Sequence, residues 1–100
     1  MEKPTPQMTI THSEVDSKGL YLAKIVGKPN AELTYSRASE NLIIIDHTGV
    51  PDALRGMGVG VKLVERAVLD ARASGTKIMP LCPFAKVQMQ RHTEWQDVLS

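Results

Sequence analysis

The chain is poor in several features that define whole classes of protein. It has a single cysteine among 100 residues, so no internal disulfide can form, and one cysteine with three scattered histidines makes no zinc signature. We therefore expect no metal site. No apolar run approaches the roughly 18 residues of a membrane span, and no apolar N-terminal segment precedes a cleavage site. These absences lead us to expect a cytoplasmic protein with no membrane partner.

An excess of charge of one sign is also lacking. The 12 basic and 11 acidic residues give a formal net charge of +1, which is too weak a field to attract nucleic acid. Hydrophobic residues make up 42% of the chain, enough for one modest core and too little for two. Residues 1–7 hold two prolines and little to bury, so we expect a flexible tail there and a single domain over residues 8–100.

The first half of the chain contains short β-type runs separated by turn residues, a pattern typical of an antiparallel meander. We expect strands at 9–15, 20–26, 31–37 and 42–46, with turns at 16–19 and 27–30. In the second strand Tyr21, Ala23 and Ile25 would share one face. The last run begins with four consecutive aliphatic residues, which predicts a strand in the middle of the sheet, covered on both faces.

The second half alternates helix and strand. Apolar residues at three- and four-residue spacing predict an amphipathic helix, with Gly75 placed to end it in the left-handed conformation: Gly60, Leu63, Val64, Ala67, Val68 and Ala71. A strand at 77–82 follows, then a second helix that begins at Pro83 and runs to Arg91, and a short closing turn or helix at 95–99 held by Trp95. The fold class is therefore α/β (α+β), with adjacent parallel strands around the first helix.

A glycine-rich loop joins the aliphatic strand to the first helix. Backbone N–H groups at a helix start lack intrahelical partners and carry the positive end of the dipole, so this order of elements suits a pyrophosphate. Two other interpretations of Gly56, Gly58 and Gly60 stay open on spacing alone. They could simply make a tight turn that lets the helix pack closely, or begin a dinucleotide-binding fingerprint, although the third glycine comes one residue early.

The segment Arg55-x-x-Gly58-x-Gly60 resembles the [Q/R]-x-x-G-x-[G/A] signature of the GNAT superfamily of N-acetyltransferases. Three other segments resemble a small GNAT-like subfamily: His47-Thr48-x-Val50-Pro51, Pro80-Leu81-Cys82-Pro83-Phe84 and Arg91-His92-Thr93-Glu94-Trp95. The resemblance implies a compact acyl-CoA N-acyltransferase fold, with a mixed, mostly antiparallel sheet and two main helices. Its two central strands, at 43–50 and 77–82, would splay apart at the ligand. The implied cosubstrate is acetyl-CoA, held by Val50, Arg55, Gly56, Met57, Gly58, Val59 and Gly60.

The resemblance also implies a reaction, the direct transfer of an acetyl group from acetyl-CoA to an amine on a small molecule or protein. The candidate catalytic residues are Cys82, which would lie near the coenzyme thiol, and His47, a candidate general base. A buried structural cysteine and a hydrogen-bonded structural histidine are the competing interpretations. The alternative function is a noncatalytic module that binds or senses acyl-CoA. Because the chain is short, its acceptor site would be open, or completed by a second copy or another protein.

Overall fold

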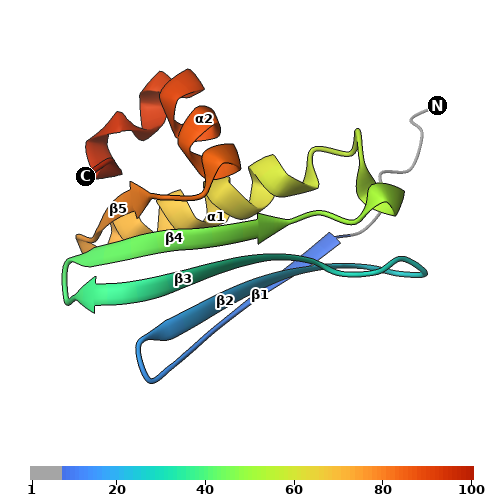
Figure 1. Cartoon of the computed structure of the whole chain (residues 1–100), viewed down its shortest axis with the longest axis horizontal. Coiled ribbons are helices and arrows are strands. Elements are labelled where there is room, and N and C mark those ends of the chain that lie inside the picture. Colours follow the sequence, from blue (N-terminus) through green and yellow to red (C-terminus); the bar gives the residue numbers. More distant parts are fainter. Residues whose placement is uncertain (1–7) are drawn as a thin grey trace.

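The computed structural model describes residues 8–100, which form a five-stranded sheet with two main helices (Figure 1). The predicted flexible tail, residues 1–7, lies outside the described residues. In the sheet the strands follow the order of the sequence: β1 (Met8–Val15), β2 (Lys18–Ile25), β3 (Ala31–Ser39), β4 (Leu42–Gly49) and β5 (Lys77–Pro80). The first four pair antiparallel, and β4 pairs parallel with β5. The predicted mixed, mostly antiparallel sheet is confirmed.

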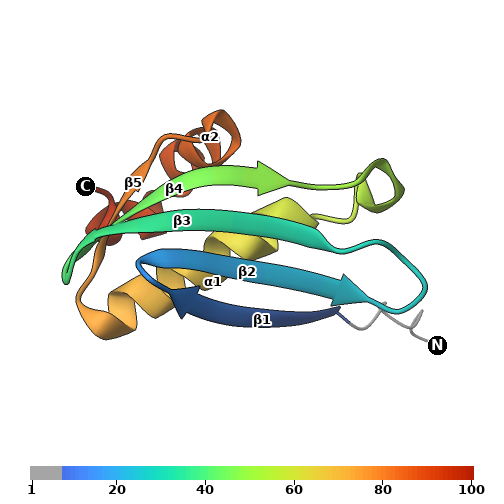
Figure 2. The same cartoon turned by 60° about the horizontal axis from the view of Figure 1, so that its bottom comes forward.

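Both main helices lie on the same side of the sheet (Figure 1). Helix α1 (Val59–Ser74) crosses behind β2 and β3, as Figure 2 shows, and packs against β2, β3 and β5. Helix α2 (Pro83–Arg91) packs against α1, β4 and β5. The core between these layers takes alternate residues of each strand, because successive side chains of a strand point to opposite faces. Its contributions from β2, β3 and β4 are Tyr21, Ala23, Ile25, Ala31, Leu33, Tyr35, Ile43 and Ile45.

The prediction that β4 lies in the middle of the sheet, covered on both faces, is wrong. β3 is the middle strand, and β4 lies between it and β5. The strand at 77–82, which was also expected to be central, is therefore an edge strand. Ile43 and Ile45 are buried beneath the helices, whereas Leu42 and Ile44 are partly exposed on the other face. A run of aliphatic residues is typical of a strand covered on both faces. Here both helices pack on one face of the sheet, and the aliphatic residues on the other face stay partly exposed.

Helix α1 follows its predicted pattern closely. Its buried residues include every one of the apolar positions named from the spacing, and Val59 in addition. Gly75 ends the helix with φ at +70°, and its N–H donates to the carbonyls of Ala71 and Arg72. The N–H of Thr76 also donates to Ala71, at 2.8 Å. The predicted left-handed helix end is confirmed.

Two connections differ in detail from the sequence-based expectation. The turn predicted over 16–19 is shorter, because Asp16 and Ser17 both adopt positive φ and close a two-residue turn, so β2 begins at Lys18. A short 3-10 helix, Asp52–Leu54, follows β4 in the connection to α1. At the C-terminal end a 3-10 segment, Thr93–Val98, buries Trp95 and confirms the predicted closing turn.

Candidate functional site: the groove at the start of α1

Two glycines with left-handed backbone shape the loop before α1. Gly56 has φ at +79° and Gly58 at +70°, a region that residues with a side chain adopt only under strain. A Cβ atom at either position would meet no atom of residues 8–100 within 4 Å. These positions therefore require glycine for the backbone conformation, and the space outside them is open to a ligand.

The N–H groups of this loop and helix start are largely free. Gly58 is the N-cap of α1 and supplies no side-chain cap. Five N–H groups of this segment have no hydrogen-bond partner within residues 8–100: those of Gly56, Gly58, Val59, Gly60 and Val61. The N–H of Met57, in contrast, donates to the carbonyl of Leu54 at 3.3 Å. Free N–H groups at the positive end of a helix dipole form a site suited to phosphate oxygens.

A groove of about 220 Å³ runs along this helix start. The structure brings most of the predicted coenzyme-binding residues together in its walls, while Met57 lies outside the lining. Val59 contributes through its backbone, because its side chain is buried in the core. The complete lining is Val50, Leu54, Arg55, Gly56, Gly58, Val59, Gly60, Val61 and Phe84.

Gly60 allows α2 to approach α1 beside this groove. A Cβ atom on Gly60 would lie 2.7 Å from Cζ of Phe84 and 3.2 Å from Cγ2 of Val50. For Gly60 the structure therefore supports the alternative interpretation, in which the glycine allows close packing around the helix. Gly56 and Gly58 have no such close neighbour.

Arg55 supplies a positive charge at the mouth of the groove. Its Nε lies 2.8 Å from Oδ1 of Asp52, in a pair where both side chains are more than three-quarters exposed. An ion pair this exposed contributes about 0–1 kcal/mol, so the guanidinium can leave Asp52 for another anion at little cost.

Beyond Ile45, strand β4 has an unpaired edge. β5 pairs with β4 only as far as Ile45 opposite Pro80, whereas β3 pairs with β4 as far as Gly49. The chain after β5 then turns away into α2, and the N–H groups of Leu81 and Cys82 both donate to the carbonyl of Ile45 at 3.1 Å. The strands therefore part at Ile45, within the segments where a splay was expected. Residues 46–49 keep a free strand edge that leads toward the glycine loop.

Cys82 lies at this parting, as the N-cap of α2 with Pro83 at the first helical position. Its side chain is buried, and Sγ is 3.5 Å from Oγ1 of Thr48 on β4. Burial alone would raise the pKa of the thiol. The N–H groups of Ala85 and Phe84 at the helix start, together with Thr48, stabilise the thiolate more strongly, so the pKa lies below its usual value.

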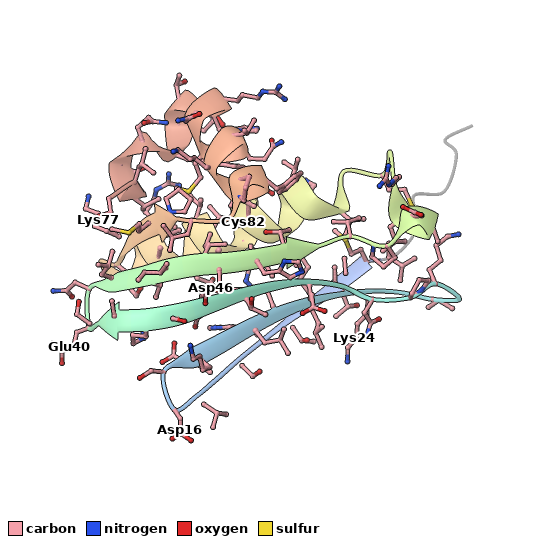
Figure 3. The ribbon with its side chains drawn as sticks, viewed as in Figure 1. Asp16, Lys24, Glu40, Asp46, Lys77 and Cys82 are labelled. Carbon is pink, nitrogen blue, oxygen red and sulfur yellow. The ribbon has the colours of Figure 1, made fainter. Side chains whose placement is uncertain are left out.

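His47 lies on the opposite face of β4 from Cys82. The register of β3 and β4 shifts between Thr34 and Tyr35, so that Asp46 is an extra residue and His47 pairs with Thr34. Thr48, which pairs with buried Leu33, is consequently the residue that faces the helices. Figure 3 shows Cys82 on the helix side of β4 and Asp46 on the other side. The structure therefore does not bring His47 and Cys82 together.

Four residues of this site were missed by sequence reasoning: Leu54, Val61 and Phe84, which line the groove, and Thr48 beside Cys82. Thr48 adjoins the thiol and Phe84 forms a wall of the groove, although both lie within segments that the resemblance had singled out. Strand alternation counted forward from buried Ile45 would have placed His47 on the helix side and Thr48 on the open face, so the extra residue at Asp46 hid the position of Thr48. The contact of Phe84 with Gly60 joins residues far apart in sequence, and no local pattern indicates it.

Within residues 8–100 no three metal-binding side chains come together in a cluster. No helix in the same part of the chain has the length and apolar character needed to cross a membrane.

Comparison with known proteins assigns the family. The model of the GCN5-related N-acetyl-transferase family matches residues 21–98. Among solved structures, the chain is similar to a GCN5-like putative N-acetyltransferase from Staphylococcus aureus, with 36% sequence identity and a TM-score of 0.66. That match covers 90% of this chain and 87% of the other. A search of curated proteins found no significant match. With a family model spanning most of its length and a fold neighbour of the same kind, the chain belongs to the GCN5-related N-acetyltransferase family, whose general activity is acetyl transfer.

Proposed function

We propose that the protein binds acetyl-CoA in the groove at the start of α1 and transfers the acetyl group to an amine. The observation that supports this proposal best is that two sets of unpaired backbone groups lie next to each other. The unpaired N–H groups of Gly56 and Gly58–Gly60 adjoin the unpaired edge of β4, which leads back to Cys82. A pyrophosphate, an amide-bearing arm and a thioester follow one another in acetyl-CoA in that same order.

Each part of the groove has a role in this proposal. The N–H groups of the loop bind the pyrophosphate, and Arg55 adds a charge-assisted contact. The edge of β4 over residues 46–49 pairs with the amide groups of the pantetheine arm in the manner of an added strand. The thioester then lies at the parting of β4 and β5, beside Cys82 and Thr48.

The amine nitrogen attacks the thioester carbon directly. A C–N bond forms, the C–S bond breaks, and the coenzyme leaves as a thiolate that takes up a proton. Backbone N–H groups at the β4 edge polarise the carbonyl oxygen. Because His47 lies on the open face of the sheet, an amine that arrives from that face would give its proton to His47, while Cys82 stays on the coenzyme side.

A covalent route through Cys82 is the second mechanism, and the lowered pKa of its thiol is the observation that favours it. In that route the thiolate first takes the acetyl group and the amine then receives it. Either route leaves the acceptor side open in this chain, so a second copy or a partner protein would complete it. The proposed site of action is the cytoplasm.

The test combines turnover and binding. Release of free thiol from acetyl-CoA is measured across a panel of small amines and lysine-containing peptides, beside calorimetric titration of acetyl-CoA. Binding with amine-dependent thiol release supports the transferase. Binding with no release across the panel supports the noncatalytic acyl-CoA module, and failure to bind contradicts both. In His47→Gln we expect slower turnover with unchanged coenzyme affinity.

A further inference from the structure

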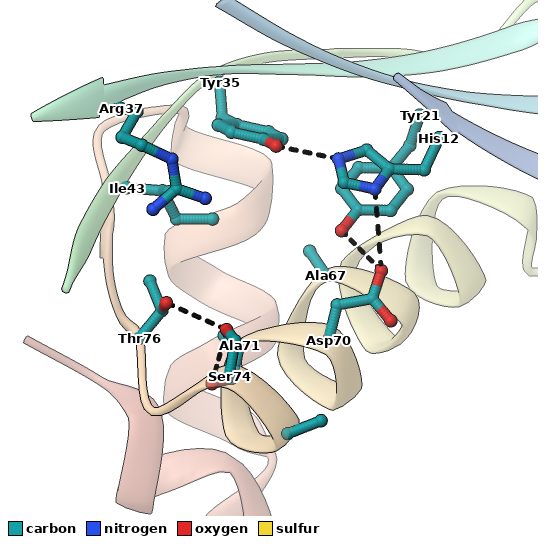
Figure 4. A pocket seen from close by; sticks show the side chains of 11 residues that line it. His12, Tyr21, Tyr35, Arg37, Ile43, Ala67, Asp70, Ala71, Ser74 and Thr76 are labelled. Carbon is teal, nitrogen blue, oxygen red and sulfur yellow. Dashed lines mark hydrogen bonds and ion pairs between the residues drawn. The ribbon is translucent and has the colours of Figure 1, made fainter. Parts of the chain in front are cut away.

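A second pocket lies at the other end of α1, between the sheet and the C-terminal half of the helix (Figure 4). Its volume is about 280 Å³. Asp70, on its wall, is eleven residues beyond the start of α1, or roughly 16 Å along the helix axis. The pocket is therefore separate from the groove at the glycine loop. Its lining includes residues of β1, β2, β3 and α1, and those used below are His12, Tyr21, Tyr35, Arg37, Asp70 and Ala71.

One side of the pocket carries the carboxylate of Asp70, which can accept a further hydrogen bond. Oδ2 of Asp70 accepts a hydrogen bond from Oη of Tyr21 at 2.7 Å and one from Nε of Arg66 at 3.2 Å. Oδ1 accepts only a longer bond, 3.3 Å from the same Arg66 nitrogen. Burial and the bond to Asp70 raise the pKa of Tyr21, so its hydroxyl remains a donor. The carboxylate of Asp70 is therefore held in place, and its Oδ1 can accept a hydrogen bond from a ligand.

The opposite side carries a guanidinium. Nε of Arg37 donates to both carboxylate oxygens of Glu14 at 3.0 Å. Nη1 donates to the carbonyls of Ser39 and Glu40. Nη2 has no acceptor anywhere in the described part of the chain, residues 8–100. Arg37 and Asp70 face each other across the pocket in Figure 4.

Aromatic rings fix the wall between these two charges. The hydroxyl of Tyr35 gives its proton to Glu14 at 2.6 Å, so Nε2 of His12, at 2.7 Å from the same oxygen, is the donor in their contact. The imidazole of His12 stacks on the ring of Tyr21, with centroids 4.2 Å apart. The floor is made of small side chains such as Ala71. The charged groups are therefore held in fixed positions around the pocket.

We propose that this pocket binds a small aliphatic amino acid, with its carboxylate at Arg37 and its ammonium at Asp70. Charges of opposite sign on facing walls match a ligand that carries both signs. A ligand with a single charge would contact either the free Nη2 of Arg37 or Oδ1 of Asp70 and leave the other group without a ligand contact. Ligand pockets usually measure about 300–1,000 Å³, and this one, at about 280 Å³, lies just below that range, which suits a small metabolite. The proposal does not depend on coenzyme binding.

The test is an NMR titration of the isotope-labelled full chain without coenzyme. The probes are glycine, β-alanine, 4-aminobutyrate and 5-aminopentanoate, which differ only in the separation of their charges, with propionate and propylamine as single-charge controls. We expect saturable shifts of amides in β3 and the C-terminal half of α1. Since each charged contact contributes about 1.5–3 kcal/mol, the best amino acid should bind at least about tenfold more tightly than either control. A smaller difference, or the absence of saturable shifts with all four, would overturn the proposal.

Variants locate the binding. Arg37→Gln and Asp70→Asn should each weaken the best probe at least about tenfold. Arg72→Gln, on the same helix but outside the lining, is the matched control and should leave the affinity unchanged. Equal affinity in Arg37→Gln and the wild type would refute the assignment. If a pocket variant does not fold, the comparison of amino acids with the single-charge controls on the wild type still decides the question.

Discussion

Replacing Gly60 by alanine tests the close packing beside the groove with one methyl group. The added Cβ would lie 2.7 Å from Cζ of Phe84 and 3.2 Å from Cγ2 of Val50, closer than the roughly 3.5–4.0 Å of ordinary carbon contacts. Alanine in place of glycine inside a helix gains about 1 kcal/mol, whereas overpacking costs about 1–3 kcal/mol. We therefore expect Gly60→Ala to lower the free energy of unfolding by about 0–2 kcal/mol, with a midpoint near 1 kcal/mol. In a domain of this size, 1 kcal/mol corresponds to a fall in Tm of about 4–8 °C.

The same change in a Phe84→Ala background has the opposite expected sign. Removing the ring eliminates the 2.7 Å contact, so the gain in helix propensity dominates and Gly60→Ala should stabilise by up to about 1 kcal/mol. Urea denaturation of the four proteins gives the coupling between the two positions. Equal effects of Gly60→Ala in both backgrounds, within about 0.5 kcal/mol, would refute the packing argument.

Four further predictions concern the site and the aromatic network. Gly58→Val, which forces a β-branched residue to φ +70°, should abolish the thermal stabilisation by acetyl-CoA, and an unchanged ligand-induced shift would contradict the loop assignment. Arg55→Ala should weaken coenzyme binding about ten- to a hundredfold in calorimetry without loss of folding, because its pair with Asp52 is exposed; an affinity within about twofold of wild type would show that the backbone alone makes the site. Cys82→Ala should retain transfer with a modest loss, and mass spectrometry should find no acetyl adduct without acceptor. An adduct on Cys82, removed by hydroxylamine and chased to product at the turnover rate, would establish the covalent route instead. Burial and the hydrogen bond to Glu14 raise the pKa of Tyr35 to about 12, so its contribution to stability is complete below pH 10 and is lost as the pH rises through 12. Urea denaturation at pH 9 and pH 11 should therefore show a smaller alkaline loss in Tyr35→Phe than in the wild type, and equal losses would contradict this.

Features determined by neighbouring residues were predictable. The helical spacing of apolar residues and the position of Gly75 defined α1, because both depend on contacts within a few turns. The glycine loop was equally accessible, since its free N–H groups follow from consecutive residues in a fixed order. Six of the seven residues expected at the coenzyme line one groove, although their part in binding stays a prediction.

Features that depend on contacts between residues far apart in the sequence were not predictable. The extra residue at Asp46 reverses the strand alternation, and only the register against β3 reveals it. The prediction that β4 is covered on both faces also failed, because the sequence does not determine on which face of the sheet each helix packs. His12 counted in the sequence only as one of three scattered histidines without a zinc signature, yet it joins residues of β2, β3 and α1 in one network. Such a network is defined by the tertiary structure and has no signature along the chain.

The agreement between strand order and chain order has a consequence for folding. Each of the first three strand pairings joins neighbours in the sequence through a short connection, which costs little loop-closure entropy. The β4–β5 pairing must instead wait for α1 to form and cross the sheet. We expect the hairpins to form early and the junction of β4 with β5 to close last. Because the groove leads to that junction, acetyl-CoA bound there would contact the part of the molecule formed after the folding transition state. It would therefore slow unfolding without speeding folding.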